Sequence, residues 1–412
     1  LVFSAATLVC LHALTLRVSR NERSAWIAAM SATALPATWV GSVIMTIDPV
    51  LVFFWTLAAY GFWRATQENA FRFWVLTGLA VGLGMLAKYT AALILVVFLL
   101  YLIVYDRKWF FRKEPWLALG LTLLCLSGVI YWNWAHDWVS FRHTAQIGAS
   151  EEYTLWTPIR NLLEFTGGQI GVVSPLVMAL FAWVGILCLL RAIDDHRAGY
   201  LVLLAGVPLV FYLVVSVARR PEANWPITGY IGACVALGWV WAFRERSCWA
   251  RRFLVAAWVL GCLMGCAVRS TDLLYMMGSP PPPGASPEKL YLGMWTINPD
   301  VDPTNRLRGG RELGQALSRY VEEQTPVPFL FSDRYQVTAW MAFYTAGRPR
   351  TYCLPFNRRQ NQYDIWGGWS ELSGRDGLFV TGGDGEKARR WVDMMLRAGL
   401  FEKGEVLETV EV

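Results

Sequence analysis

The amino-acid sequence predicts a polytopic α-helical membrane protein with a C-terminal extracytoplasmic α/β domain. Of its 412 residues, 55% are hydrophobic and 17% are charged, whereas about 25% of the residues of an ordinary soluble domain are charged. Mean hydropathy is +0.36. The apolar residues gather in long runs before residue 270, and the polar residues gather after it. This pattern excludes a disordered chain and a single soluble domain.

Ten apolar runs predict membrane spans. A bilayer core about 30 Å thick needs roughly 20 apolar residues per helix, and several of the runs are shorter. The spans are predicted near residues 1–16, 26–45, 50–64, 73–88, 90–105, 115–134, 168–190, 199–217, 226–243 and 252–269. Because the chain starts with Leu1 inside an apolar run, we expect that an N-terminal piece is missing.

Basic residues predict the orientation of these spans. One set of alternate connections contains 15 Lys and Arg residues, whereas the opposite set contains 5. The basic set comprises residues 17–23, 63–72, 106–113, 191–197 and 243–252. Positively charged loops stay in the cytoplasm, so we expect the opposite connections and the C-terminal tail to lie outside it. One of these outer connections, at about 135–166, is long.

The tail has the pattern of a separate domain. We expect a membrane domain over 1–270, a Pro-rich linker over 271–287 and an α/β domain over 288–412. RELGQALSRYVEE and GEKARRWVDMMLRAGLFEKG predict helices, whereas PFLFSD, RPRTYCL, GLFVTGG and EVLETVEV predict strands of a partly parallel sheet. The net charge is +8 before Thr271 and −2 from Thr271 onward. Because the basic excess lies among the apolar runs, nucleic acid is not an expected partner.

Two charged residues interrupt apolar sequence on the predicted outer side. Asp48 stands between two spans, where an acid is costly unless it meets a partner or water. Its alternative role is to cap a helix that begins at Pro49. Lys88 lies between two apolar runs and could bind a phosphate as a point charge. The alternative is a lysine that extends its ammonium group to the membrane surface.

The segment ARRPEANWP adds a second group of polar residues on the outer side. Arg219 and Arg220 depart from the positive-inside pattern, and arginine matches phosphate oxygens bidentately. Glu222 and Asn224 follow them. An ordinary charged turn that ends at Pro226 is the alternative.

Two further groups of polar residues are weaker candidates. The long outer connection carries His136, Asp137, His143, Glu151 and Glu152, which could hold a divalent metal. No HExxH or CxxC spacing accompanies them, and solvated loop residues are the alternative. The tail contains polar loop residues that could contact a ligand or simply hydrogen bond within the fold. These are Tyr335, Gln336, Arg358, Arg359 and Asn361.

Several motifs together resemble a known family. They are TIDPVLVFFWTLAAY, GLAVGLGMLAKYTAALIL, YWNWAHDWVSFRHTAQ, GGQIGVVSPL, RRPEANWP, SDRYQVTAWMAFY and NRRQNQYDIW. The chain is similar in these motifs to bacterial GT-C glycosyltransferases of the protein O-mannosyltransferase and aminoarabinose-transferase-like superfamily. The resemblance implies a polyprenyl-phosphate sugar donor, a lipid, protein or glycan acceptor, and a site at the periplasmic face of the bacterial inner membrane.

The resemblance also implies roles for single residues. The principal catalytic acid of the family lies in the first outer loop, which would precede Leu1. Asp48 matches a second acidic position, and Lys88 matches a lysine at the outer membrane face. Arg219 and Arg220 suit the carrier phosphate. The candidates for substrate contacts are His136, Glu222, Asn224, Tyr335, Gln336, Arg358 and Asn361. A divalent metal is possible, and no other cofactor is expected.

The sequence leaves two alternatives to an enzyme. One is a flippase or transporter of polyprenyl lipids, and the other is a relative that only binds glycolipid. A transporter usually carries charges within its spans or has paired broken helices. Here the charges stand at the outer ends of the spans and an outer domain follows, which favours a glycosyltransferase.

Overall fold

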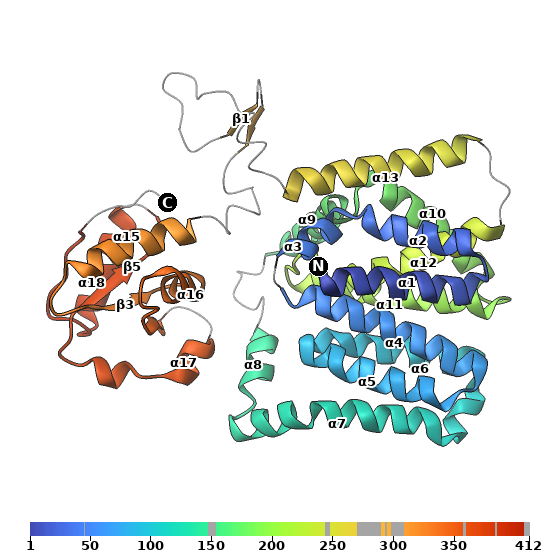
Figure 1. Ribbon diagram of the computed structural model, residues 1–412, viewed down its shortest axis with the longest axis horizontal. Helices are drawn as coiled ribbons and strands as arrows, with labels where there is room; N and C mark the ends of the chain where they lie inside the picture. Colours follow the sequence, from blue (N-terminus) through green and yellow to red (C-terminus); the bar gives the residue numbers. More distant parts are fainter. Residues whose placement is uncertain are drawn as a thin grey trace. The chain divides into compact units, whose positions relative to one another are not determined.

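The computed structural model shows two compact units, Leu1–Met277 and Gly278–Val412 (Figure 1). It describes residues 1–44, 46–146, 154–243, 248–269, 290–292, 295–297, 309–356, 360–383 and 385–407. The Pro-rich linker expected over 271–287 lies outside these ranges. The domain boundaries expected from the sequence therefore stay predictions.

The first unit is entirely helical in its described part. Two 3₁₀ turns, η1 (Tyr89–Ala92) and η2 (Arg107–Phe111), flank α6. The helices are α1 (Val2–Ser19), α2 (Glu22–Thr33), α3 (Pro36–Val43), α4 (Asp48–Glu68), α5 (Phe71–Ala87), α6 (Leu93–Tyr105), α7 (Lys113–Ala135), α8 (Val139–Gln146), α9 (Thr157–Val173), α10 (Pro175–Arg191), α11 (His196–Ala218), α12 (Ile227–Phe243) and α13 (Cys248–Arg269).

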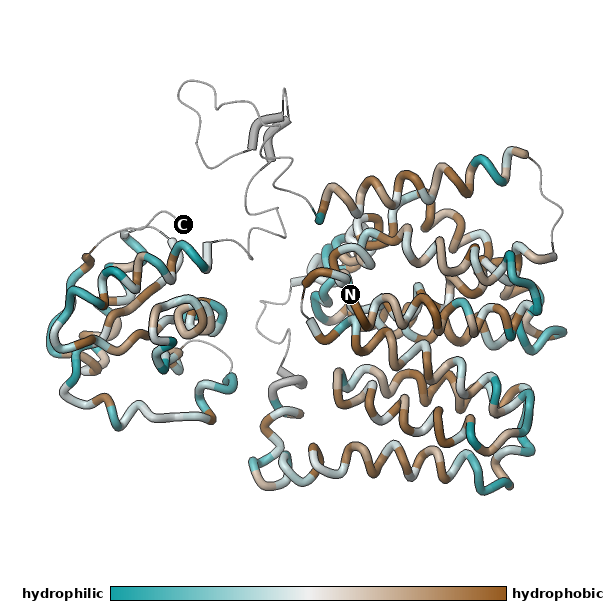
Figure 2. The backbone as a smooth tube through the Cα atoms, in the orientation of Figure 1, coloured by the Kyte–Doolittle hydropathy of each residue, from teal (hydrophilic) through white to brown (hydrophobic). Residues whose placement is uncertain are grey.

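Four of these helices, α1, α7, α11 and α13, are long and apolar enough to cross a membrane, among the described residues. Two bent pairs, α3 with α4 and α9 with α10, raise this number to as many as 6. Three shorter apolar segments accompany them, Phe71–Ala87, Tyr89–Tyr105 and Ile227–Ala242. Apolar residues extend along most helices of this unit (Figure 2).

Two of the predicted spans are wrong as continuous helices. The run 26–45 is divided, because α2 ends at Thr33 and a second helix begins at Pro36. The run 168–190 is also divided, because the chain bends by 104° between α9 and α10 at Ser174. The outer connection is shorter than expected, since α9 already begins at Thr157.

Close helix contacts hold the unit together. The helices α4, α5 and α7 lie side by side (Figure 1). A Cβ added to Gly82 of α5 would lie 2.6 Å from the Cβ of Cys125 of α7, so this contact requires glycine. The rings of Phe62 and Phe98 stack with centroids 4.0 Å apart. The buried Tyr200 hydroxyl donates to the Ala59 carbonyl oxygen at 2.9 Å, which ties α11 to α4.

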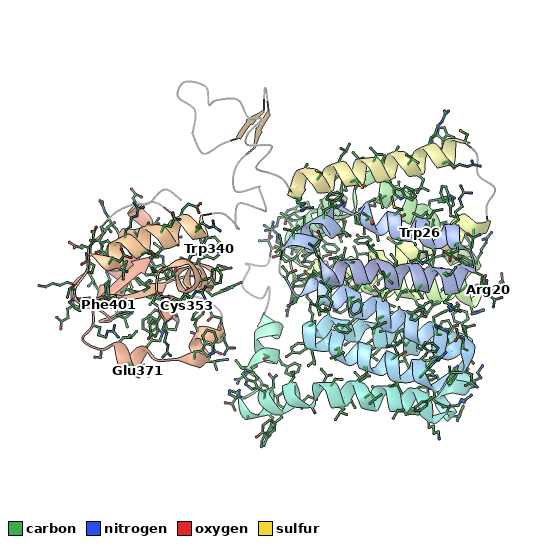
Figure 3. The ribbon with its side chains drawn as sticks, in the orientation of Figure 1. Arg20, Trp26, Trp340, Cys353, Glu371 and Phe401 are labelled. Atoms are coloured by element: carbon green, nitrogen blue, oxygen red, sulfur yellow. The ribbon has the colours of Figure 1, made fainter. Side chains whose placement is uncertain are left out.

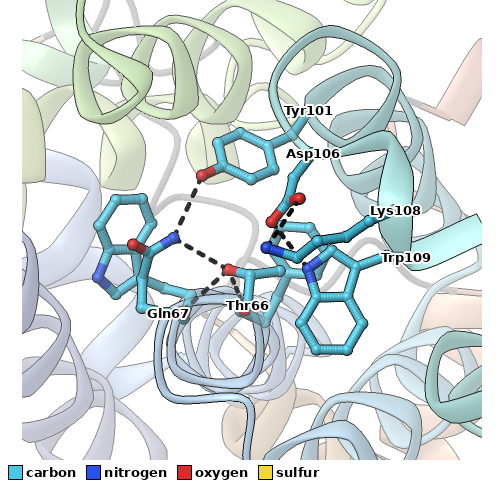
Figure 4. Close-up of polar contacts among 8 residues, drawn as sticks. Thr66, Gln67, Tyr101, Asp106, Lys108 and Trp109 are labelled. Atoms are coloured by element: carbon cyan, nitrogen blue, oxygen red, sulfur yellow. Dashed lines mark hydrogen bonds and ion pairs between the residues drawn. The ribbon is translucent and has the colours of Figure 1, made fainter. Parts of the chain in front are cut away.

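A polar cluster closes the turn after α6, at one end of the bundle (Figure 4). The Asp106 carboxylate accepts a hydrogen bond from the Trp109 indole at 2.9 Å and pairs with the Lys108 ammonium at 3.1 Å. The Gln67 amide donates to the Tyr101 hydroxyl at 3.4 Å. These contacts connect the end of α4 to the end of α6, so this end of the bundle is fixed by polar side chains.

The second unit contains a three-stranded parallel sheet in the order β4-β3-β5. Its strands are β3 (Phe329–Ser332), β4 (Thr351–Cys353) and β5 (Gly377–Val380). Its helices are α15 (Gly310–Glu322), α16 (Tyr335–Tyr344), α17 (Gln362–Trp366) and α18 (Gly385–Arg397). A short antiparallel pair, β1 (Leu290–Leu292) and β2 (Trp295–Ile297), belongs to the same unit.

The parallel sheet and the two helices at either end of the predicted domain agree with the sequence pattern. The final strand does not, because residues 405–407 are not in a strand, and residues 408–412 lie outside the described ranges. Phe331 of β3 is buried against Phe401, which follows α18 (Figure 3). The core of this unit therefore lies around its central strand.

Candidate functional site

Asp48 and Lys88 form an ion pair in the first unit. The Lys88 ammonium lies 2.9 Å from one Asp48 carboxylate oxygen, and the side chains are only 18% and 20% exposed. Asp48 is the first residue of α4, and Lys88 directly follows α5. Because α4 and α5 are antiparallel neighbours, these two residues meet at the same end of the bundle.

The predicted cap role of Asp48 is not what the structure shows. The N-cap position of α4 is Ile47, and no side-chain cap hydrogen bond is present there. The Asp48 carboxylate instead contacts two distant residues, Lys88 and Asn224. A negative charge in the first turn still interacts favourably with the helix dipole. The carboxylate therefore serves a tertiary cluster rather than the local backbone.

The connection between α11 and α12 completes this cluster. The Asn224 side-chain amide donates to the second Asp48 oxygen at 2.6 Å. The Lys88 ammonium lies 5.8 Å from the centroid of the Trp225 ring, within the range of a cation–π interaction. Tyr212 of α11 also contacts this ring, with centroids 5.8 Å apart. Three separate segments thus converge on one carboxylate, and we call Asp48, Lys88, Asn224 and Trp225 the Asp48 cluster.

Arg220, one of the predicted phosphate-binding arginines, has a carboxylate partner. The Arg220 guanidinium pairs with Glu164 of α9 at 2.9 Å, and the two side chains are 60% and 39% exposed. Arg219 is half-buried at the end of α11. Glu222 is exposed on the same connection, which links the Asp48 cluster to α9. The pairing of Glu164 with Arg220 could not be predicted from the sequence, because Glu164 lies on a helix more than 50 residues away from Arg220.

His136 is not joined to the Asp48 cluster by any contact among the described residues. Its ring stacks on Trp132 at 4.2 Å, and its Nδ1 atom lies 2.8 Å from the Trp132 carbonyl oxygen. The helix that follows does approach the cluster, because Phe141 of α8 stacks on Tyr89, with centroids 5.2 Å apart. The side chain of His143 and both glutamates at 151 and 152 lie outside the described residues.

The described residues contain no group of three or more His, Cys, Asp or Glu side chains that could hold a metal ion. The expected metal therefore has no assigned ligands. Gln169 of α9 and Tyr230 of α12 are buried polar residues that pair with each other. The Tyr230 hydroxyl donates to the Gln169 side chain at 2.9 Å.

The candidates in the second unit lie on helices, where the sequence had suggested loops. Tyr335 and Gln336 occupy the first turn of α16, and the Tyr335 side chain is 53% exposed. Asn361 is the N-cap of α17 and forms a capping box with Asp364. This is a structural hydrogen-bonding role of the kind that the sequence left open. Arg358 and Arg359 lie outside the described residues.

Comparison with known proteins finds glycosyltransferases that are similar to this chain. Residues 1–132 match the family described as dolichyl-phosphate-mannose-protein mannosyltransferase. The chain is 26% identical over 240 residues to lipid A galacturonosyltransferase RgtD of Rhizobium johnstonii, which covers 58% of this chain and 50% of the relative. It is 31% identical over 115 residues to lipopolysaccharide core galacturonosyltransferase RgtA of the same organism, which covers 28% of this chain and 23% of the relative.

A solved structure extends the likeness to nearly the whole chain. The crystal structure of ArnT from Cupriavidus metallidurans, bound to undecaprenyl phosphate, matches with a TM-score of 0.57 and 12% identity. The match covers 95% of this chain and 76% of that protein. At this identity the likeness shows a shared fold. The chain spans about half the length of RgtD and less of RgtA.

Proposed function

We propose that this chain, an integral membrane protein with the GT-C glycosyltransferase fold, transfers a sugar from a polyprenyl-phosphate carrier to a glycolipid acceptor. The observation that carries the proposal is the Asp48 cluster, in which a carboxylate and an ammonium group meet at one end of the helix bundle. The similarity to two galacturonosyltransferases and the fold shared with ArnT support the same reaction class.

The chemistry needs one base and one group that stabilises negative charge. A hydroxyl oxygen of the acceptor attacks the anomeric carbon of the donor sugar, and the bond from that carbon to the phosphate oxygen breaks. The electron pair of that bond stays on the phosphate, so polyprenyl phosphate leaves, and the hydroxyl proton passes to a carboxylate. A positioned carboxylate accelerates such proton transfer by about 10²–10⁴-fold, and a cation near the departing phosphate stabilises its charge.

The contacts of the Asp48 cluster leave capacity for both roles. An ammonium group has three donors, and Lys88 uses one of them on Asp48. Two remain for phosphate oxygens. A carboxylate has about four lone-pair sites, and Asp48 accepts hydrogen bonds from Lys88 and Asn224. An acceptor hydroxyl can therefore approach Asp48 while the ion pair persists.

The names of the relatives suggest the substrates. We propose lipid A or the lipopolysaccharide core as acceptor, and galacturonic acid on a polyprenyl phosphate as the first donor to test. Undecaprenyl phosphate is the proposed carrier, since ArnT was crystallised with it. These substrates imply the bacterial inner membrane, with the second unit in the periplasm.

The test is a transfer assay on the full-length protein in lipid nanodiscs. A radiolabelled polyprenyl-phosphate galacturonate is supplied with lipid A, and both labelled lipid A and released polyprenyl phosphate are measured. We expect equal amounts of the two products from the wild type. Asp48→Asn should lower turnover at least about 100-fold, whereas the exposed Asp194→Asn is the matched control and should not.

Two outcomes would contradict this proposal. Full transfer by the Asp48→Asn variant would remove Asp48 from the reaction. Movement of the labelled carrier across a liposome membrane, without any transfer to lipid A, would support the transporter alternative.

A further inference from the structure

An aromatic pocket with a volume of about 570 Å³ opens on the second unit, and none of its lining residues belongs to the Asp48 cluster. Its walls come from the C-terminal half of α16, from the chain that enters β4, and from α17. The residues that matter here are Ala342, Phe343, Arg350, Tyr352, Tyr363 and Trp366.

Two aromatic side chains of this pocket lie outside the buried core of the unit, to which Tyr352 belongs. Phe343 and Trp366 are each 62% exposed, although both are large and apolar. The Tyr363 and Trp366 rings meet edge to face, with centroids 5.2 Å apart, so they form one continuous wall. Exposed apolar surface that is gathered in one concave place marks a binding site. The face of an exposed aromatic ring such as that of Trp366 suits the C–H face of a sugar ring.

Arg350 supplies a fixed positive charge at the same wall. Its guanidinium donates to the Gly367 carbonyl oxygen at 3.1 Å and lies 5.3 Å from the centroid of the Tyr352 ring. The same nitrogen, Nη2, also donates to the Trp366 carbonyl oxygen at 3.4 Å. The other terminal nitrogen, Nη1, lies 3.6 Å from Glu371, and both side chains are more than half exposed. An exposed pair at this distance is weak, so an anion of the ligand can replace Glu371 at Nη1.

A second arginine lies beside the pocket without lining it. The Arg348 guanidinium lies 5.5 Å from the centroid of the Phe343 ring. The Asp364 carboxylate of α17 accepts a hydrogen bond from the Asn361 backbone at 2.6 Å and serves the N-terminus of that helix. Arg350 is therefore the charged side chain in the described wall of the pocket, in a part of the chain whose net charge is −2 from Thr271 onward.

Tyr363 provides a neutral hydroxyl among these groups. Burial raises the pKa of Tyr363, although a hydrogen bond with the Thr351 side chain opposes the rise. The phenol thus stays protonated at neutral pH and adds no negative charge to the pocket. Asn361 fixes its position, because the Asn361 side chain accepts a hydrogen bond from the Tyr363 backbone at 2.9 Å.

We propose that this pocket binds a sugar that carries an anionic substituent, with the ring against Tyr363 and Trp366 and the anion on Arg350. The anion is a uronate carboxylate or a sugar phosphate, since arginine recognises both through the same fork. The choice of a glycan as ligand rests on the proposed function, in which this sugar is part of the acceptor.

The experiment measures binding rather than transfer, so that its failure is distinct from failure of the proposed reaction. Full-length protein in nanodiscs is titrated calorimetrically with trigalacturonate, with its methyl ester, and with deacylated lipid A, which carries phosphates. The same titrations use the exposed Asp194→Asn, which should bind these probes like the wild type. We expect at least one anionic probe to bind about tenfold more tightly than the ester, and the stronger probe identifies the anion.

Variants separate the pocket from general effects of folding. Trp366→Ala and Arg350→Gln should each weaken binding about tenfold, whereas the exposed Arg375→Ala changes the net charge equally and should have no effect. Glu371→Gln removes the competing carboxylate and should strengthen binding about two- to fivefold, since an exposed pair contributes about 0.2–1 kcal/mol. A gain of affinity cannot arise from misfolding.

Three results would overturn this inference. The first is that the acid and its ester bind equally while deacylated lipid A does not bind. The second is that Trp366→Ala and Arg350→Gln both leave the affinities unchanged. The third is that Glu371→Gln weakens binding.

Discussion

Lys88 contributes an ammonium group that two partners can share. The Asp48 carboxylate holds it at 2.9 Å, and the Trp225 ring lies 5.8 Å away. If Lys88 served only to orient Asp48, its removal would have no further effect in a chain that already lacks the Asp48 charge. If Lys88 also contacts the carrier phosphate, its removal should weaken carrier binding both in the wild type and in the chain that lacks the Asp48 charge.

We predict that Lys88→Ala lowers turnover about 100-fold, as removal of a charge-stabilising donor typically does. Lys88→Arg should be milder because the charge is kept. Binding of undecaprenyl phosphate to nanodisc-embedded protein should also weaken when Lys88→Ala is added to Asp48→Asn. Equal binding by the single Asp48→Asn variant and the double variant would leave Lys88 with a positioning role alone.

Glu164 competes with any phosphate for Arg220. The pair is largely exposed, so its loss should change the free energy of unfolding by only about 0.2–1 kcal/mol. We predict that Glu164→Gln lowers the Kd for undecaprenyl phosphate and that Arg220→Gln raises it. Unaltered Kd values in both variants would show that Arg220 belongs to a structural pair.

Sequence reasoning identified both members of the Asp48–Lys88 pair but only Arg220 of the pair with Glu164. Asp48 and Lys88 stood out because each interrupts apolar sequence. Their mutual contact could not be predicted, since 40 residues separate them and only the pairing of α4 with α5 brings them together. Trp225 belongs to the ARRPEANWP segment that stood out in the sequence, whereas Glu164 did not stand out, because a single carboxylate within a helix is an ordinary feature.

At the scale of elements, proline shows why hydropathy alone could not place every helix. Pro208 lies inside α11, and the helix continues through it. Pro36 and Pro175 instead begin new helices. Membrane helices tolerate internal proline when neighbours satisfy the freed backbone groups. A proline within an apolar run therefore predicts neither continuity nor a break, and the runs 26–45 and 168–190 looked continuous.

The packing of α11 on α12 gives a test of element placement. A Cβ added to Gly232 would lie 2.7 Å from the Ala205 backbone nitrogen, and backbone atoms cannot move aside without shifting a helix. We predict that Gly232→Ala destabilises the protein by about 1–3 kcal/mol, as overpacking usually does. Thermal unfolding in detergent measures this loss. Gly185→Ala is the matched control, because nothing lies within 4 Å of an added Cβ there. A lower melting temperature in the control alone would contradict the packing argument.

The whole molecule divides into a helical unit and an α/β unit, and the sequence pattern indicated both kinds of structure. Periods of apolar residues distinguish long membrane runs from short alternating helices and strands. The sequence could not indicate that residues 335–344 form a helix, because their aromatic and apolar side chains are not gathered on one helix face. It also predicted a last strand that residues 405–407 do not form.

Orientation is the prediction that belongs to the whole chain. Basic residues number 15 in one set of connections and 5 in the other. We predict that a reporter enzyme active only outside the cytoplasm works when it is fused after Val412, and that a reporter active only inside the cytoplasm does not. The reverse pattern of activities would invert the orientation and place the aromatic pocket in the cytoplasm.

The shorter apolar helices have a consequence for the surrounding lipid. An α-helix rises about 1.5 Å per residue, so the 17 residues of α5 span roughly 25 Å, whereas the hydrocarbon layer is about 30 Å thick. A bilayer adapts to such hydrophobic mismatch by thinning around the short helices. Because Lys88 follows the last residue of α5, we expect the lipid surface to dip beside it. A long polyprenyl chain could then remain in the hydrocarbon layer while its head group reaches the Asp48 cluster.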